Sequence, residues 1–323
     1  LSDGHIKIIL KYLKDHHMIK LVEKKYLWFL ISILVISIGI ITISNRALKS
    51  DPLFNLGIDF LGGNSYILKF DYLKNEYHKD PNNKKNINLQ LIASLRDTLV
   101  KLGLTKNTIQ ITNNNEVIIK TLTLKHEENQ KILTQLRQEY GTIEVLEIDF
   151  IGPSIGLELK EKSLAIILFV SIALLLYISI RFKLKYGIAA IIALAHDTLI
   201  TLTFTALLNI EINTAYVAAL LTILGYSIND TIVIFDRIRE NEKLYAHSKS
   251  QNEIINTSIS QTLRRTINTS LTTLAVVSSL LLFGGITIKS FTIVLLIGVL
   301  AGTYSSIFIA SPLLSKKQIS SDL

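Results

Sequence analysis

Six long apolar runs dominate the pattern of hydrophobic and polar positions along the chain. A helix that crosses ~30 Å of hydrocarbon needs about 20 mostly apolar residues, and each run approaches or exceeds that length. We therefore predict a multi-span α-helical membrane protein built as a bundle of six transmembrane helices. The predicted spans are residues 27–43, 163–180, 187–208, 214–235, 269–286 and 290–314.

A polar segment, residues 44–162, separates the first span from the second and carries the pattern of a small folded domain. Its order of strands and helices, βαββαβ, is that of an α+β ferredoxin-like sandwich. Within it, residues 72–86 are rich in Lys, Asn and Asp, which predicts a solvated loop. The predicted strands are 65–70, 108–112, 116–121 and 142–151, and the predicted helices are 89–102 and 127–140.

Basic residues in the short connections predict the orientation of the bundle, because such loops stay on the cytoplasmic side. Lys24 and Lys25 precede the first span and Arg181 follows the second, whereas residues 209–213 hold no Lys or Arg. Both chain ends, residues 1–26 and 315–323, are therefore expected in the cytoplasm, and residues 44–162 are expected in the periplasm. The polar segment escapes the rule because long translocated domains cross regardless of charge.

Composition excludes several classes of function. The 323 residues are 49% hydrophobic and 19% charged, with a net charge of +8 and no Cys. Disulfides, thiol nucleophiles and cysteine-based metal sites are therefore ruled out. The chain has no phosphate-binding loop, nucleophile elbow or dinucleotide fingerprint. We expect no enzyme and no cofactor, and any work across the membrane must draw on an ion gradient or another subunit. The positive loops need no nucleic acid to explain them.

Two ionisable residues near one end of the bundle are the first candidates for function, because such groups are costly in hydrocarbon. Asp230 lies near the end of the fourth span and Arg265 lies just before the fifth. One interpretation is a static ion pair that joins two helices. The other is a protonatable carboxylate whose charge is controlled by a guanidinium that approaches and departs.

His196 and Asp197, in the third span, form the second candidate site. They are either a hydrogen-bonded structural pair or a relay position, and no third ligand nearby predicts a metal. Asn229, Asn268 and Thr269 are the supporting polar residues, which either line a hydrated path or permit close helix packing.

The connection between the fourth and fifth spans is also patterned. Residues 236–243 carry mixed charge and predict a helix emerging from the membrane. Further on, Ile254, Ile255, Ile259 and Leu263 form an amphipathic stripe, which we expect to lie at the membrane interface.

Four motifs together resemble the SecF subunit of the bacterial SecDF protein-export complex, in the resistance-nodulation-division superfamily. The resemblance covers nearly all of residues 20–314, although Leu61 stands where that family usually has Thr. The motifs are Gly57-Ile58-Asp59-Phe60-Leu61-Gly62-Gly63, Ala195-His196-Asp197, the long run from Leu224-Gly225-Tyr226-Ser227 through Asn229-Asp230 to Glu240-Asn241, and Gln261-Thr262-Leu263-Arg264-Arg265-Thr266-Ile267-Asn268-Thr269-Ser270.

The resemblance implies a subunit of the bacterial inner membrane that pairs with SecD. Such a complex assists the SecYEG channel and the SecA motor, with YajC and YidC as further partners, and pulls unfolded preproteins outward at the expense of the proton gradient. By position, the resemblance makes Asp230 the protonatable carboxylate and Arg265 its mobile partner, with Asp197 as a further residue of the proton pathway. Membrane lipid is the remaining partner, and no cofactor or nucleic acid is implied.

Two alternatives stay open at this point. The chain is either a passive scaffold that holds SecD and the channel together, or half of a proton-driven exporter of lipids or drugs. A scaffold predicts that neutral Asp230 alters assembly or nothing. An exporter usually carries both six-helix halves in one chain, which disfavours a lone half.

Overall fold

The computed structural model describes residues 20–105, 107–112, 116–121, 126–245, 247–285 and 288–315. Most of the predicted N-terminal segment, residues 1–19, and most of the predicted tail, residues 316–323, lie outside these ranges. The chain forms two compact units. The smaller unit comprises Leu56–Ile166 with Glu211–Thr214, and the larger unit holds the remaining described residues.

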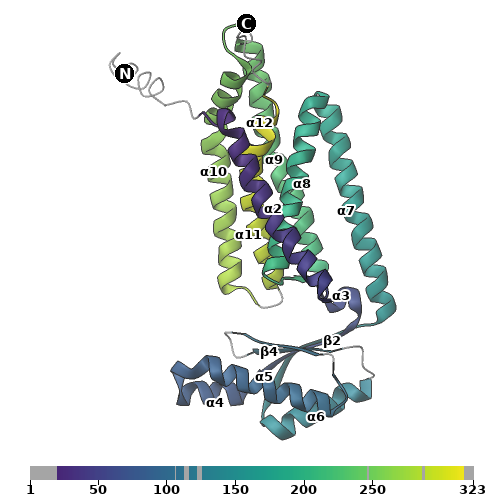
Figure 1. Ribbon diagram of the computed structural model, residues 1–323. Helices are drawn as coiled ribbons and strands as arrows, with labels where there is room; N and C mark the ends of the chain where they lie inside the picture. The colour runs from purple at the N-terminus through teal and green to yellow at the C-terminus, as the bar shows by residue number, and fades with distance from the viewer. Residues whose placement is uncertain are drawn as a thin grey trace. The chain divides into compact units, whose positions relative to one another are not determined.

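The larger unit is helical. Six helices within the described residues are long and apolar enough to cross a membrane, and they follow the order of the six predicted spans (Figure 1). The prediction of a multi-span helical membrane protein is therefore confirmed. The helices are α2 (Lys25–Leu48), α7 (Pro153–Arg181), α8 (Leu184–Leu207), α9 (Thr214–Tyr245), α10 (Gln251–Phe283) and α11 (Lys289–Ser305).

Helices α9 and α10 extend well beyond the predicted spans. Helix α9 continues through residues 236–243 as the mixed-charge pattern predicted. Helix α10 begins 18 residues before the predicted span, where Ser250 and Glu253 form a capping box that satisfies exposed backbone N–H groups. The two helices are therefore joined by a short turn rather than a long loop.

The early turns of α10 overturn the prediction of an interfacial stripe. Ile254, Ile255 and Ile259 are at most 3% exposed, and they pack in one apolar cluster with Val22 and Ile238. An amphipathic stripe alone does not distinguish a membrane surface from a protein core. Here the apolar side is covered by the start of the first membrane helix and by the end of α9.

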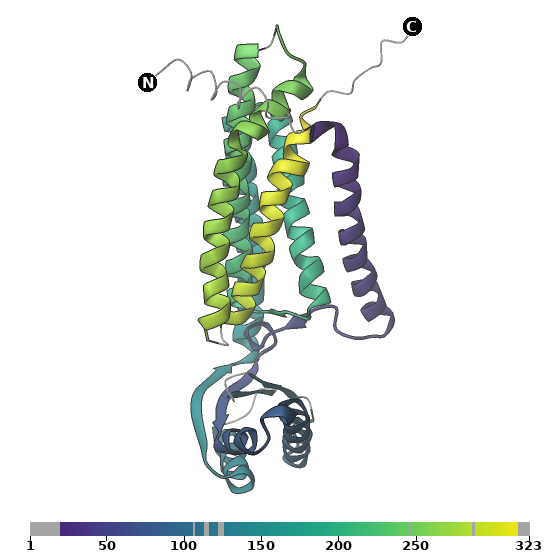
Figure 2. The same cartoon turned by 90° about the vertical axis from the view of Figure 1, so that its left-hand side faces the viewer.

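Small residues bring α11 and α9 into close contact. A Cβ on Gly298 would lie 2.1 Å from Ile223 Cδ1, and a Cβ on Gly302 would lie 2.9 Å from Ser227 Cβ. The two glycines are four residues apart and share one helix face, the small-xxx-small pattern by which membrane helices approach each other. Figure 2 shows α11, in yellow, running beside α10, which it also contacts.

The last membrane helix changes its winding. Helix α11 continues directly into the π-helix η4 (Ser306–Ala310) and then into α12 (Ser311–Leu313). The Ser311 hydroxyl donates to the Ser306 carbonyl five residues earlier, at 2.7 Å. Short π segments within α-helices are frequent at functional sites, and this one adjoins the buried polar residues described below.

The smaller unit is a four-stranded antiparallel sheet with helices packed on it. The strands lie in the order β3-β4-β2-β5, and the chain runs strand, helix, strand, strand, helix, strand, as the sequence pattern predicted. Tyr66, Leu68 and Phe70 of β2 are completely buried against Leu95 of α5 and Leu136 of α6. The elements are β2 (Gly63–Phe70), α5 (Lys84–Lys101), β3 (Asn107–Ile111), β4 (Glu116–Thr121), α6 (His126–Tyr140) and β5 (Ile143–Ile151).

The predicted solvated loop at residues 72–86 is wrong. Helix α4 (Asp71–Lys79) occupies its first part, and α5 already begins at Lys84. Leu73 of α4 is completely buried and Tyr77, one turn later, packs against the same core. The two apolar residues anchor α4 although the surrounding composition is polar, because residues four apart share a helix face.

Candidate functional site

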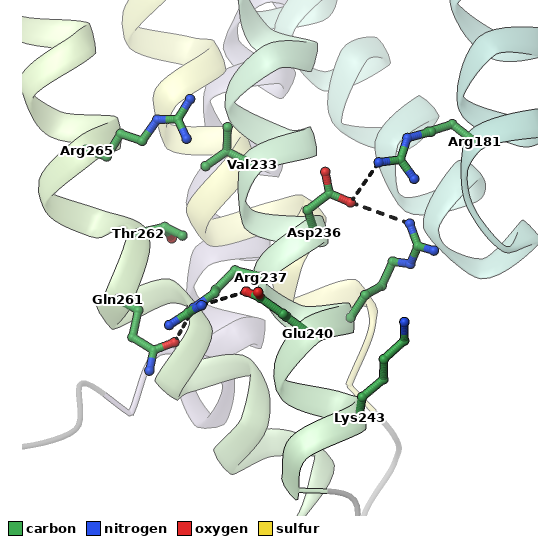
Figure 3. Close-up of a pocket in the computed structure, with 10 residues that line it drawn as sticks. Arg181, Val233, Asp236, Arg237, Glu240, Lys243, Gln261, Thr262 and Arg265 are labelled. Carbon is green, nitrogen blue, oxygen red and sulfur yellow. Dashed lines mark hydrogen bonds and ion pairs between the residues drawn. The ribbon is translucent and has the colours of Figure 1, made fainter.

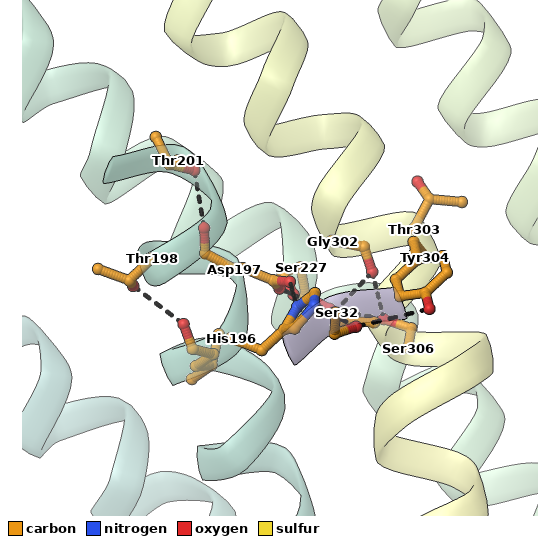
Figure 4. A network of polar contacts seen from close by, with 12 residues as sticks. Ser32, His196, Asp197, Thr198, Thr201, Ser227, Gly302, Thr303, Tyr304 and Ser306 are labelled. Atoms are coloured by element: carbon orange, nitrogen blue, oxygen red, sulfur yellow. Dashed lines mark hydrogen bonds and ion pairs between the residues drawn. The ribbon is translucent and has the colours of Figure 1, made fainter. Parts of the chain in front are cut away.

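Asp197, on α8, lies at the centre of a buried polar network that joins three helices (Figure 4). Its Oδ2 atom accepts hydrogen bonds from Ser227 Oγ of α9 at 2.5 Å and from Ser305 Oγ of α11 at 2.8 Å. Its Oδ1 atom lies 2.9 Å from His196 Nδ1. Both carboxylate oxygens therefore have partners, although the side chain is 0% exposed.

His196 connects this network to α2. Its Nε2 atom lies 3.0 Å from Ser32 Oγ, and its ring stacks on Tyr304 with centroids 5.8 Å apart. The Tyr304 hydroxyl donates in turn to the Trp28 carbonyl at 2.9 Å. Both ring nitrogens of His196 are thus committed. Within the described ranges, no three His, Asp or Glu side chains gather as a metal site would require.

A second set of hydroxyls lies one turn further along α9, against the π-helix. Thr231 Oγ1 and Ser306 Oγ are 2.8 Å apart, and Ser306 also donates to the Gly302 carbonyl at 2.8 Å. Ser227 and Thr231 are four residues apart, so both face α11. The network therefore follows the contact between α9 and the segment where α11 changes its winding.

Asp230 lies between these two residues in sequence but does not join their hydrogen bonds. It is 3% exposed, and its Oδ2 atom is a buried polar atom without a hydrogen-bond partner. Among the residues that the structure describes, Asp230 takes part in no ion pair, whereas Arg265 on α10 is exposed and lines an open pocket with Val233 of α9. A static ion pair between Asp230 and Arg265 is therefore absent from this conformation.

The supporting polar residues do not gather around Asp197. Asn229 and Asn268 are exposed on α9 and α10, and the Thr269 hydroxyl donates to the backbone carbonyl of Arg265 at 2.9 Å. The hydroxyl of Thr266, beside Arg265, is buried and has no partner. Buried polar groups are normally paired, so each such exception calls for a functional or a solvent partner.

The sequence pattern did not single out the partners of Asp197. Ser227, Ser305 and Ser306 were not candidates, because serines in apolar helices are equally common as packing residues. One signal was present: Gly298 and Gly302 form a Gly-x-x-x-Gly pattern that marks a close helix contact. That contact brings α11 near enough for its hydroxyls to reach α8 and α9.

The Gly-Ile-Asp-Phe motif has a structural role in the smaller unit. The Oδ2 atom of Asp59 accepts from the backbone N–H of Thr214 at 2.8 Å and from its hydroxyl at 2.5 Å, so Asp59 satisfies the first residue of α9. The Gly57 N–H donates to the Ile212 carbonyl at 2.9 Å. Gly62 and Gly63 have φ values of 74° and 148°, which favour glycine.

Six membrane-spanning helices with two buried carboxylates and a small α+β unit after the first helix define a multi-span membrane protein built for more than anchoring. Residues 131–319 match the family described as "Protein export membrane protein SecD/SecF, C-terminal". The chain is 38% identical over 296 residues to "Protein translocase subunit SecF" of Sebaldella termitidis, which covers 91% of this chain and 90% of that relative. The chain belongs to the SecF family.

Two further similarities agree with this assignment. The SecF of Calditerrivibrio nitroreducens is 39% identical over 312 residues, covering 94% of this chain and 95% of that relative. The solved structure of SecDF from Thermus thermophilus, a translocon-associated membrane protein, superposes with a TM-score of 0.76 at 34% identity. The match covers 90% of this chain and 37% of the SecDF chain, so this chain spans little more than a third of that longer protein.

Proposed function

We propose that the chain is an auxiliary subunit of the Sec export machinery, which works with SecD and uses the proton gradient to promote preprotein translocation. The observation that carries this proposal is the contrast between the two buried carboxylates. Asp197 has hydrogen bonds to both oxygens, whereas one oxygen of Asp230 has no partner. Two carboxyl groups in unlike environments are suited to different roles.

In this proposal Asp230 takes up and releases the proton and Arg265 controls its charge. A buried charge without a partner costs far more free energy than a neutral acid. When the Arg265 guanidinium is away from the carboxylate, as in the structure, protonation relieves that cost. When the guanidinium approaches, the charged form is stabilised and the proton leaves. A cycle of approach and departure would therefore link proton movement to movement of α10 against α9.

Asp197, His196 and the surrounding serines have a supporting role in the proposal. Their hydrogen bonds join α2, α8, α9 and α11 into one polar network next to the π-helix. We place them in the proton pathway as the part that fixes helix positions, with Asn229, Asn268 and Thr269 on the outer side of α9 and α10.

SecD is the proposed partner, with SecYEG, SecA, YajC and YidC as further contacts of the complex. The solved relative carries SecD and SecF in one chain, as its name SecDF states. In this chain, Asn229 and Asn268 are exposed on membrane-spanning helices. Exposed amides in hydrocarbon are costly, so a protein partner over this side of α9 and α10 would relieve that cost.

The proposed location is the bacterial inner membrane, with both chain ends in the cytoplasm and residues 44–162 in the periplasm. The basic residues Arg181, Lys183, Arg237 and Arg239 lie at the ends of α7 and α9, where the positive-inside rule places the cytoplasm. We further propose that the smaller unit is a ferredoxin-like sandwich, because its strand order β3-β4-β2-β5 is the order of that fold.

The test is preprotein export into inverted membrane vesicles that contain SecD and lack their own SecF, with and without a proton gradient. Asp230→Asn should assemble with SecD and lose the gradient-dependent part of export, and Arg265→Lys should retain part of it if charge alone matters. Asp51→Asn changes the same chemistry at an exposed position outside the spans and should behave as the unmodified chain. A gradient effect that survives in Asp230→Asn would refute the proton role, and a loss of SecD binding instead would identify a scaffold.

A further inference from the structure

Five basic residues from three helices line one open pocket at an end of the helical bundle (Figure 3). The pocket has a volume of about 580 Å³. Asp236 and Glu240 are the carboxylates among its described lining residues, so five cations against two anions leave three positive charges in excess. The basic residues are Arg181 of α7, Arg237, Arg239 and Lys243 of α9, and Arg265 of α10.

Two of the guanidinium groups are held together by shared partners. Arg181 and Arg239 both contact Asp236 Oδ1, at 3.6 and 3.5 Å, and Figure 3 shows the carboxylate between them. The guanidinium carbon of each also lies 5.2 Å from the centre of the Phe182 ring. Cation–π contacts and the shared carboxylate fix both side chains before any ligand arrives, which lowers the entropy cost of binding.

The carboxylates of the pocket are already occupied. Arg237 contacts Glu240 Oε2 at 2.6 Å and Gln261 Oε1 at 2.6 Å, and Asp236 is shared as described. Among the described residues, neither Lys243 nor Arg265 takes part in an ion pair. The excess positive charge therefore belongs to side chains that are free to meet an incoming anion.

We propose that this pocket binds an anionic phosphate group, either the headgroup of an acidic phospholipid or a soluble phosphate. A phosphate presents several strong acceptor oxygens, and the planar fork of arginine matches them in pairs. The pocket lies where α7 ends and α9 extends past its predicted span. Basic pockets at this level of membrane helices are suited to acidic headgroups.

The positive-inside rule alone explains basic residues at the ends of spans, but it does not explain their arrangement. Solvated lysines and arginines of that kind need no pocket, no shared carboxylate and no common aromatic ring. Here side chains from separate helices converge, and Arg181 lies 58 residues from Arg239 in sequence. The convergence is the feature that distinguishes a binding site from a charged surface.

The test uses the full chain and two probes. Nanodiscs of phosphatidylcholine with and without phosphatidylglycerol supply the lipid, and inorganic phosphate is titrated onto the chain in neutral detergent. Native mass spectrometry measures retained phosphatidylglycerol, and calorimetry measures phosphate binding. Lys243→Gln and Arg237→Gln should each weaken binding about tenfold, the loss of one charge-assisted contact. Lys183→Gln removes the same charge from an exposed position outside the pocket and should change affinity less than about twofold, since exposed charges interact weakly through water.

The two probes separate the two sources of phosphate. Retention of phosphatidylglycerol without binding of inorganic phosphate assigns a lipid headgroup, and binding of inorganic phosphate assigns a soluble ligand. Equal affinity of all three variants, or no binding of either probe to the unmodified chain, would overturn the proposal. Because the measurement is an equilibrium between chain and ligand, it holds whether or not Asp230 carries protons.

Discussion

Ser227 donates a 2.5 Å hydrogen bond to Asp197 across the contact between α9 and α8. The two residues are 30 positions apart in sequence, and both side chains are 0% exposed. A charge-assisted hydrogen bond in a low-dielectric interior is stronger than the same bond in water. Ser227 also lies against Gly302 of α11. This pair therefore marks the point where three membrane helices are fixed relative to one another.

The first prediction compares the two buried carboxylates by their effect on stability. Asp197→Ala leaves Ser227, Ser305 and His196 without their acceptor, and each orphaned donor costs about 1–3 kcal/mol. We expect a loss of at least about 3 kcal/mol in the free energy of unfolding. Asp230→Ala removes a side chain whose Oδ2 has no partner, so its cost should stay below about 1 kcal/mol.

Trp28 provides the measurement for both variants, because it is the single tryptophan of the chain and its carbonyl accepts from Tyr304 beside the network. Its fluorescence during thermal unfolding in detergent reports the bundle directly. Equal losses in Asp197→Ala and Asp230→Ala would show that the hydrogen bonds of Asp197 do not hold the helices together.

The second prediction concerns the contact between α11 and α9. Gly302→Ala places a Cβ 2.9 Å from Ser227 Cβ, so the helices must separate and Ser227 must shift from Asp197. Overpacking of this kind costs about 1–3 kcal/mol. Gly225→Ala is the matched control on α9, because its Cβ meets nothing within 4 Å and alanine favours a helix by up to about 1 kcal/mol. If both variants unfold at the same temperature, the close contact has no energetic role.

The third prediction concerns the hydroxyl of Thr266, which is buried without a partner. Thr266→Val keeps the shape and removes the unpaired polar group, so the free energy of unfolding should rise by about 1 kcal/mol. Thr201→Val removes a hydroxyl that donates to the Asp197 carbonyl at 2.8 Å and should be neutral or destabilising. Thermal unfolding of the two variants gives the comparison. A larger loss in Thr266→Val than in Thr201→Val would reveal a partner for the Thr266 hydroxyl.

Hydropathy predicted the six spans because the thickness of a bilayer sets the length of an apolar helix. It could not predict where α9 and α10 end, since those ends lie beyond the apolar runs and are determined by a capping box and by contacts with Val22 and Ile238. Composition failed for α4 for a related reason. Leu73 and Tyr77 anchor that helix within an otherwise polar stretch, and an average over the stretch hides them.

The candidate site was predicted in part. Asp197, Asp230 and His196 stand out because ionisable residues in apolar helices are rare. Their partners do not, because the hydroxyls of Ser227 and Ser305 reach Asp197 from 30 and 108 positions away. Only the packing of helices brings them together. The relation between Asp230 and Arg265 also needed the structure, since sequence spacing permits an ion pair that this conformation does not contain.

The last prediction concerns Asp59, whose carboxylate accepts both the N–H and the hydroxyl of Thr214. A carboxylate at the start of a helix satisfies an exposed N–H and interacts favourably with the helix dipole. Asp59→Ala should therefore weaken the first turn of α9 by about 1–2 kcal/mol. Hydrogen exchange of the amides in residues 214–217, followed by mass spectrometry, should become about tenfold faster. Asp51→Ala removes an exposed carboxylate just before the same motif and should leave these amides unchanged. Unchanged exchange in Asp59→Ala would mean that the first turn of α9 is held by other contacts. In that case the Gly-Ile-Asp-Phe motif would contribute through its glycines, whose positive φ values shape the entry into β2.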